Sequence, residues 1–129
     1  MTEANTKEAL EAALEPFSRK LRTANDVKVV AMRMDAIVAI LLGSPFVQNR
    51  LGAARTADFA SKSPELPVLL RELGDPAFLE AADHASDLLD LSRPSIIEGD
   101  NVDQEIVLAD DSRQRFRDAF AGGLAASKL

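Results

Sequence analysis

Three pairs of residues, each a helix-capping residue followed by proline, divide this chain into short segments: Ser44-Pro45, Ser63-Pro64 and Asp75-Pro76. The side-chain oxygen of an N-cap residue accepts a free backbone N–H, and proline at the first helical position has no N–H to leave unpaired. Gly43 and Gly74 stand directly before two of these pairs, where a glycine suits the left-handed conformation that ends many helices. This punctuation predicts a series of short helices.

Apolar residues at helical spacing fill the segments between these marks. Leu10, Leu14, Phe17 and Leu21 form one stripe of a first helix, which Pro16 should kink or break. Alanine, the strongest helix former, is abundant throughout. We predict a mainly α fold, a compact bundle of five to six short helices, at about 7–23 (capped by Thr6), 26–42, 45–60, 64–73, 76–91 and from 111 or 112 onward.

The pattern changes between Arg93 and Asp111. Ser95–Glu98 and Glu105–Ala109 are short β-prone runs, and Gly-Asp-Asn between them is a turn signal. We therefore expect a small β-hairpin or an extended arm at about 95–109, which needs a surface to pack on because an isolated hairpin is marginal in water. We predict a single domain at 1–129, with a helical core at 1–92, this arm at 93–111 and a C-terminal helix at 112–129.

The most apolar part of the chain runs from Val27 to Pro45. After Asp35, the seven residues Ala36–Leu42 include no polar side chain, so this half of the helix should be covered on every side. A membrane span needs about 20 apolar residues, so we expect no contact with a membrane. Two alternatives are left: a central core helix surrounded by the other helices, or a helix whose cover is completed by another subunit.

Charge is segregated along the chain, whose net charge is −6. Residues 1–64 carry nine basic and seven acidic side chains, residues 65–111 carry two and thirteen, and residues 112–129 carry four and one. The acidic middle and basic tail could meet within one chain or between neighbours, or the acidic run could be an ordinary solvated face. Nucleic acid is an unlikely partner despite Arg113, Arg115 and Arg117, because an acidic domain lacks the electrostatic footprint that phosphate contacts need.

The best candidate for chemistry is the group Glu80, His84 and Asp87. Their i, i+4 and i+7 spacing could present two carboxylates and one imidazole to a divalent metal. One imidazole on an open helix makes a poor site, however, so we interpret these residues as a solvated face. The chain has no cysteine and no other histidine, and it contains neither a G-x-S-x-G nucleophile elbow nor a phosphate loop. We therefore predict no catalytic residue, no metal and no cofactor, and hence no enzyme.

These features favour a non-enzymatic structural or assembly subunit that acts through protein–protein contacts, with copies of itself or within a larger assembly. By analogy alone, a small connector of a virion or phage head–tail junction fits this profile. The alternative is a soluble regulatory or ligand-binding helical domain that acts as a monomer or dimer. The amino terminus lacks a secretion signal, so we expect a cytoplasmic location, or assembly there into a particle. The predicted contact residues are Ile96, Ile97, Ile106, Val107, Arg113, Phe116, Arg117 and Phe120.

Overall fold

The computed structural model describes residues 3–127 and is helical from end to end. Its elements are α1 (Glu3–Leu14), the short 3₁₀ helix η1 (Glu15–Ser18), α2 (Ala24–Leu42), α3 (Pro45–Leu51), α4 (Ala53–Lys62), α5 (Leu66–Leu73), α6 (Pro76–Leu91), α7 (Pro94–Ile97) and α8 (Val102–Ala126). No strand occurs among residues 3–127. The predicted mainly α fold is confirmed.

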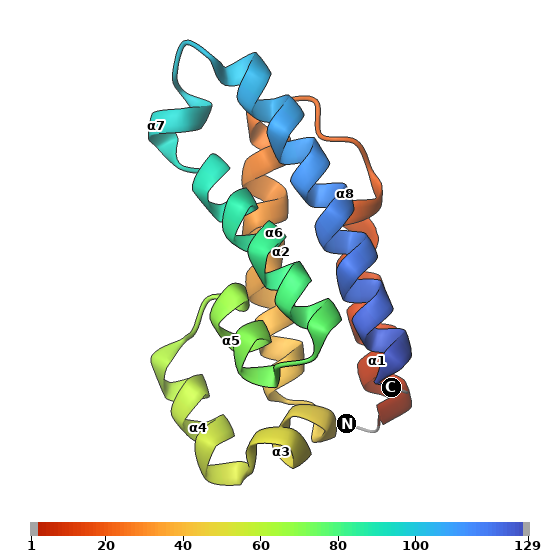
Figure 1. The fold of residues 1–129 in the computed structure, drawn as a ribbon. Coiled ribbons are helices and arrows are strands. Elements are labelled where there is room, and N and C mark those ends of the chain that lie inside the picture. The colour runs from red at the N-terminus through yellow and green to blue at the C-terminus, as the bar shows by residue number, and fades with distance from the viewer. Residues whose placement is uncertain (1–2, 128–129) are drawn as a thin grey trace.

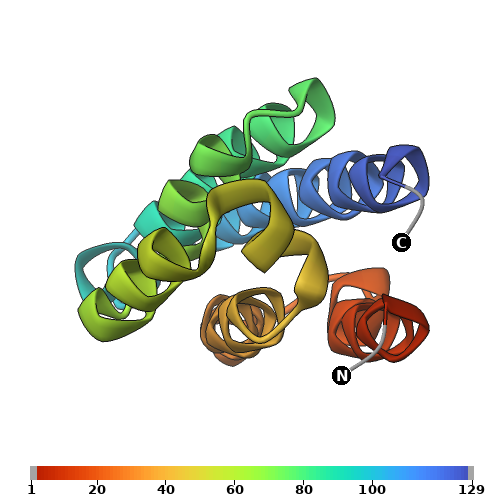
Figure 2. The same cartoon turned by 90° about the horizontal axis from the view of Figure 1, so that it is seen from below.

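The helices form two sides of the molecule around one core. Helices α6 and α8 lie side by side and make the most extensive contact between any two elements (Figure 1). Viewed from below, α1 and α2 lie on one side, and α6 and α8 lie on the other (Figure 2). Helix α5 packs against α6 and α2, and the short helices α3 and α4 close the lower end. The outer faces of α2 are therefore at the edge of the molecule.

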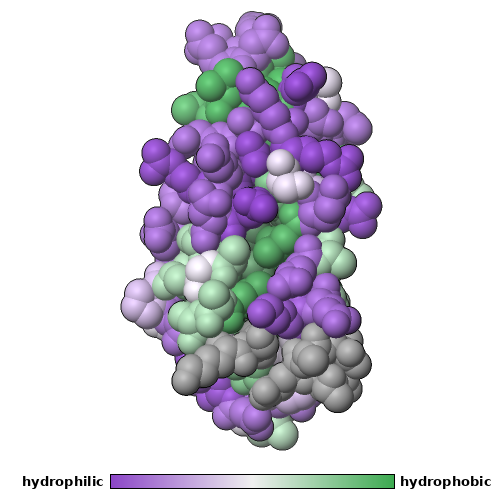
Figure 3. Space-filling view, turned by 90° about the vertical axis from the view of Figure 1, so that its right-hand side faces the viewer, coloured by the Kyte–Doolittle hydropathy of each residue, from purple (hydrophilic) through white to green (hydrophobic). Residues whose placement is uncertain are grey.

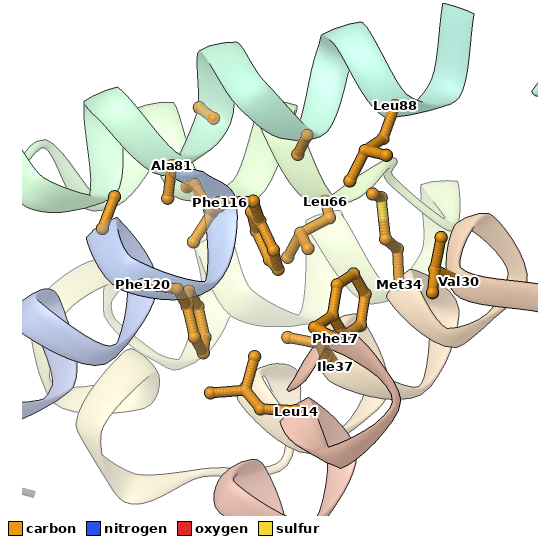
Figure 4. Packing of buried hydrophobic residues seen from close by; sticks show 14 of the residues in the cluster. Leu14, Phe17, Val30, Met34, Ile37, Leu66, Ala81, Leu88, Phe116 and Phe120 are labelled. Carbon is orange, nitrogen blue, oxygen red and sulfur yellow. The ribbon is translucent and has the colours of Figure 1, made fainter. Parts of the chain in front are cut away.

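A chain of phenylalanine rings runs through the core and joins four elements. The ring centroids are 5.0 Å apart for Phe17 and Phe116, 5.5 Å for Phe116 and Phe120, 5.6 Å for Phe120 and Phe78, and 6.3 Å for Phe78 and Phe46. Tilted and offset pairs at these separations are favourable beyond the area they bury. Figure 4 shows Phe116 and Phe120 pointing from α8 into the core, where Phe17 lies beside Ile37 of α2.

The predicted interruption of the first helix is confirmed, but its helical stripe is confirmed only in part, because residues 19–23, which include Leu21, are not helical. Leu10, Leu14, Phe17 and Leu21 are all buried, and the α-helix ends at Leu14, ahead of the proline in η1. The predicted start of the first helix was wrong. Helix α1 begins at Glu3, so Thr6, the expected N-cap residue, lies inside the helix.

Helix α2 starts with a capping box. The Thr23 hydroxyl accepts a hydrogen bond from the backbone N–H of Asp26, and the Asp26 carboxylate accepts one from Thr23 N–H at 3.0 Å. The same carboxylate accepts a further bond from Arg22 N–H at 2.8 Å. These bonds, the one from Arg22 first, lower the pKa of Asp26 below the ordinary value of an aspartate, because they stabilise the charged form.

Two of the predicted punctuation marks are confirmed. The Ser44 hydroxyl accepts a hydrogen bond from Val47 N–H at the start of α3. Gly74, at the end of α5, has φ of +79°, in the left-handed region where a side chain would be strained. Both marks act through residues within four positions in sequence, which is why sequence alone could predict them.

Of the three other marks, Ser63 was wrong, whereas Gly43 and Asp75 stand at the predicted helix ends but lack the expected left-handed conformation and cap bond. Ser63 has φ of +48° and ends α4, whereas Glu65 caps α5. Gly43 is right-handed, with φ of −86°. Asp75 is the N-cap residue of α6, but its carboxylate accepts a hydrogen bond from Arg50 Nη1 at 2.8 Å and makes no cap bond. The arginine comes from another helix, so a tertiary contact takes the oxygen that the local pattern assigned to the cap.

The single helix expected at about 45–60 is two helices. Gly52 has φ of +87°. Because no helical residue has this dihedral angle, the helix is interrupted there and the segment forms α3 and α4. Gly52 is the C-cap of α3 and the N-cap of α4. The glycine was visible in the sequence, but its spacing alone did not distinguish a tolerated helical glycine from a turn.

The hairpin or extended arm expected at 95–109 is not confirmed. Its first β-prone run forms α7, and its second lies in α8, which begins at Val102, ten residues before the predicted start. Ile106, Ala109, Arg113 and Phe116 are all buried and follow each other at intervals of three and four residues. This spacing continues the buried face of α8 toward its start. As a helix, this segment buries that face in the core against α6 and η1, whereas a hairpin would have had no third strand to complete it.

Gly122 and Gly123 give a matched test of the packing between α6 and α8. A methyl group added at Gly123 would lie 2.5 Å from a ring carbon of Phe78, whereas one added at Gly122 would meet nothing within 4 Å. We expect Gly123→Ala to lower the free energy of unfolding by about 1–3 kcal/mol through overpacking. Gly122→Ala should raise it by about 0.5–1 kcal/mol, because alanine favours a helix over glycine. Urea denaturation of both variants checks this, and equal effects would contradict the close approach of Gly123 to Phe78.

Candidate functional site

The outer face of α2 carries a row of uncovered apolar residues. Val29 is 38% exposed and Met32 is 70% exposed, and Ala36 and Ala39 are also exposed. Their spacing of three, four and three residues places them on one seam of the helix. The opposite face, which includes Val30, Met34 and Ile37, points into the core (Figure 4).

This row corrects the expectation that the second half of the helix is covered on every side. Ile37, Val38 and Leu41 are buried, but Ala36 and Ala39 are exposed, so α2 is not a central helix surrounded by the others. The chain tolerates the open face because an alanine methyl group presents little apolar area to water. The other alternative, cover by another subunit, stays a prediction.

Charged residues border the row on both sides. At 100° per residue, Lys28 and Asp35 lie along one flank, and Asp26 and Arg33 lie along the other. Lys28, Arg33 and Asp35 form no ion pair with any other residue in the range 3–127. The three charges are therefore available to a partner.

Two hollows adjoin this helix. One, of about 230 Å³, is lined by Pro16, Lys20, Val29 and Arg33 among others. The other, of about 520 Å³, lies between α2 and the α4–α5 connection. Val29 at one end of the apolar row lines the first hollow, and Ala39 at the other end lines the second.

Most of the contact residues predicted from the sequence are buried in the folded protein. Phe116 and Phe120 are fully buried, and Arg113, Ile97 and Ile106 are less than a tenth exposed. Ile96 is half-buried, whereas Val107 and Arg117 are exposed. Of these residues, only Val107 and Arg117 are exposed enough to contact a partner, with 69% of Val107 and 47% of the Arg117 side chain exposed.

Arg113 instead joins α8 to the segment after α1. Its Nη1 donates to the Phe17 carbonyl oxygen at 2.8 Å, its Nε donates to Asp110 Oδ1 at 3.0 Å, and its Nη2 lies 2.9 Å from the same oxygen in an ion pair. The same carboxylate oxygen accepts a hydrogen bond from Leu21 N–H at 2.8 Å. This ion pair satisfies two backbone groups where the chain passes between α1 and α2.

The ion pairs that join the acidic middle to the basic tail, Arg113–Asp110 and Arg115–Asp111, lie within α8. Arg115 pairs with Asp111 at 2.9 Å within α8. Bridges between helices involve other arginines, such as Arg71 of α5 with Asp83 of α6 at 3.6 Å and Arg55 of α4 with Glu72 of α5. The side of the molecule drawn in Figure 3 is mostly hydrophilic, with hydrophobic residues along a strip in its middle and in a second patch near its upper end.

Glu80, His84 and Asp87 share one face of α6, as the spacing predicts. His84 Nε2 lies 3.9 Å from a Glu80 carboxylate oxygen, and Nδ1 lies 4.0 Å from one of Asp87. The imidazole side chain is 18% exposed and both carboxylates are well exposed. Over the described part of the chain, no group of three or more histidine, cysteine, aspartate or glutamate side chains is placed to hold a metal ion.

Comparisons with known proteins identify no relative. No protein-family model matches the sequence, and no curated protein or solved structure is significantly similar to it. Within residues 3–127, no single helix is long and apolar enough to cross a membrane; only α2 and α3 taken together meet that test, and they are bent by 70°. The outer face of α2 is therefore the candidate site on structural grounds alone.

Proposed function

We propose that this protein is a non-enzymatic structural or assembly subunit that acts through contacts with other protein chains, its own copies included. The observation that carries the proposal is the exposed apolar row Val29, Met32, Ala36 and Ala39 on α2. Single exposed apolar residues are common on protein surfaces and need no explanation. A row of four on one helix, bordered by unpaired charges, has the pattern of a helix-packing seam.

A contact at this row offers both affinity and selectivity. Removing the half-exposed Val29 and the largely exposed Met32 from water is favourable in proportion to the apolar area buried. The charges on the two flanks would select the partner and its direction. A connector-type component of a virion or phage head–tail junction is one form that such a subunit takes, and we retain it as the narrower proposal.

The proposal is tested by isolating the protein with its partners from the cells that produce it. We expect cross-linking, size-exclusion chromatography and mass spectrometry to find the wild type in a complex with itself or another chain. Met32→Asp should reduce the recovered complex about tenfold or more, since it places a charge in a contact that must be dehydrated. The variant should keep its helical circular-dichroism spectrum.

Val68→Asp is the matched control for this experiment. Val68 is 45% exposed on α5, so its replacement adds the same charge at an exposed apolar position away from α2. We expect this variant to form the complex like the wild type. A wild-type protein that is monomeric at all concentrations and in all salts, with no protein partner recovered, would instead favour the regulatory or ligand-binding alternative.

A further inference from the structure

We propose that α2 pairs with α2 of a second copy of this chain, antiparallel, about a two-fold axis between Val30 and Ala31. This inference rests on the proposed function, since it names the occupant of the exposed face. The axis places Val29 opposite the partner's Met32, and Asn25 opposite the partner's Ala36. In the single chain, Met32 is 70% exposed, and the pairing would remove it from water.

The row has the spacing that a pair of packed helices needs. With the exposed Asn25 one step before the row, Asn25, Val29, Met32, Ala36 and Ala39 follow each other at intervals of four and three residues, all on the exposed side of α2. This is the heptad pattern in which one helix meets another along a seam. Within α2, the buried residues form a separate stripe on the opposite side (Figure 4). The residues of the seam therefore take no part in packing the core of their own chain.

The flanking charges favour the antiparallel direction. In a parallel pair, opposite flanks face each other, and Lys28 would approach the partner's Arg33, a repulsive contact. In an antiparallel pair, each flank of the helix instead meets the same flank of the partner helix. Lys28 then faces the partner's Asp35, and Asp26 faces the partner's Arg33. Two-fold symmetry doubles each contact, giving four attractive pairs.

The charges also select one register. In the next register that keeps the seam in contact, the two-fold axis passes through residue 34. This register would set Arg33 against the partner's Arg33 and Asp35 against the partner's Asp35. Moving the axis the other way, to residue 27, would oppose Lys28 to the partner's Lys28 and Asp26 to the partner's Asp26. Like charges at close range are unfavourable, so among the registers that keep the apolar row in contact, only the proposed one is attractive on both flanks.

The surroundings of α2 leave room for the second copy. The helix lies at the edge of the molecule, on the side away from α6 and α8 (Figure 2). The hollow of about 230 Å³ lined by Pro16, Val29 and Arg33 adjoins the position of the partner's Met32 and can hold its flexible side chain. Asp26 lines the same hollow, beside the position of the partner's Arg33.

The dimer should be weak. One helix pair buries less than the roughly 800 Å² per partner of a standard interface, so we expect a dissociation constant in the micromolar range. Sedimentation equilibrium on the purified full-length protein, from about 5 μM to 500 μM, measures it. Because surface ion pairs are screened by salt, association should weaken between 20 mM and 300 mM sodium chloride.

Disulfide trapping tests the register. The chain contains no cysteine, so introduced thiols report only their own contacts. A mixture of Val29→Cys and Met32→Cys proteins should form a disulfide-linked heterodimer faster than a mixture of Val29→Cys and Ala39→Cys, which would face each other in the neighbouring register. Equal rates, or a faster second mixture, would overturn the proposed register.

A charge swap tests the flanks. Lys28→Glu and Asp35→Lys should each weaken dimerisation about tenfold, because each turns two attractive pairs into repulsive ones. The double variant Lys28→Glu/Asp35→Lys restores opposite charges and should dimerise like the wild type. Lack of rescue in a variant with an unchanged circular-dichroism spectrum would overturn the pairing.

The two proposals fail in different ways. A purified wild type that stays monomeric at 500 μM would overturn the pairing of α2 with α2. Recovery of another protein bound through Met32 would then keep the assembly function. Only a protein that neither self-associates nor retains a partner would overturn both proposals.

Discussion

Replacing Phe116 with alanine is expected to lower the free energy of unfolding by about 3–5 kcal/mol. Phe116 is completely buried and lies between Phe17, with centroids 5.0 Å apart, and Phe120, at 5.5 Å. The truncation removes apolar contacts on both sides and leaves a cavity in a core that cannot fully collapse. Urea denaturation followed by circular dichroism measures the loss.

Two further variants make this result interpretable. Phe116→Leu keeps most of the apolar volume and should lose less, about 1–1.5 kcal/mol, so a value is obtained even if the alanine variant does not fold. Leu108→Ala, at a position 56% exposed on the same helix, should change the free energy by no more than about 0.5 kcal/mol. A loss below about 1 kcal/mol for Phe116→Ala would contradict its place in the core.

Arg113→Ala should lower the free energy of unfolding by about 3 kcal/mol, the second-largest effect that we expect. The change leaves Asp110 without its cation and the Phe17 carbonyl oxygen without the donor that lies 2.8 Å away. Breaking one partner of a largely buried ion pair leaves a charge whose dehydration is uncompensated. Arg115→Ala is the matched control, because that ion pair with Asp111 is about 60% exposed at both residues and should contribute no more than about 0.5 kcal/mol.

A double-mutant cycle isolates the interaction between the two side chains. Asp110→Ala should also destabilise the protein, since it removes the acceptor of Leu21 N–H as well as the anion. The double variant should lose clearly less than the sum of the two single losses, because the second replacement removes the charge that the first one left unpaired. Additive losses would show that the two residues stabilise the fold independently.

The place of Arg113 explains why the predicted contact surface differs from the proposed one. The sequence shows arginines alternating on a helix close to two phenylalanines, which is compatible with a surface or with a core. Whether Arg113 is buried or exposed depends on its hydrogen bond to the Phe17 carbonyl oxygen, which lies 96 residues away along the chain. No local pattern reports that distance, and only folding brings the two groups together.

The sequence contains the exposed row of α2, but it does not distinguish this row from the buried residues of the same helix. Val29, Met32, Ala36 and Ala39 repeat at helical spacing, and so do the buried residues of the same helix. A helix that is apolar on several sides does not reveal which side faces the core. The expectation of complete cover was reasonable from composition, and it failed because the neighbouring helices lie on one side only.

The sequence by itself determined the features that depend on neighbours along the chain. The mainly α class, the break of the first helix at Pro16, the Ser44 cap and the left-handed Gly74 all follow from dihedral preferences and from contacts within one or two turns. Tertiary structure decided the helical state of residues 102–111, the buried role of Arg113 and the open face of α2. These outcomes depend on which surfaces meet across the core, and the free energy of burying them outweighs local preferences that are worth a fraction of a kilocalorie per residue.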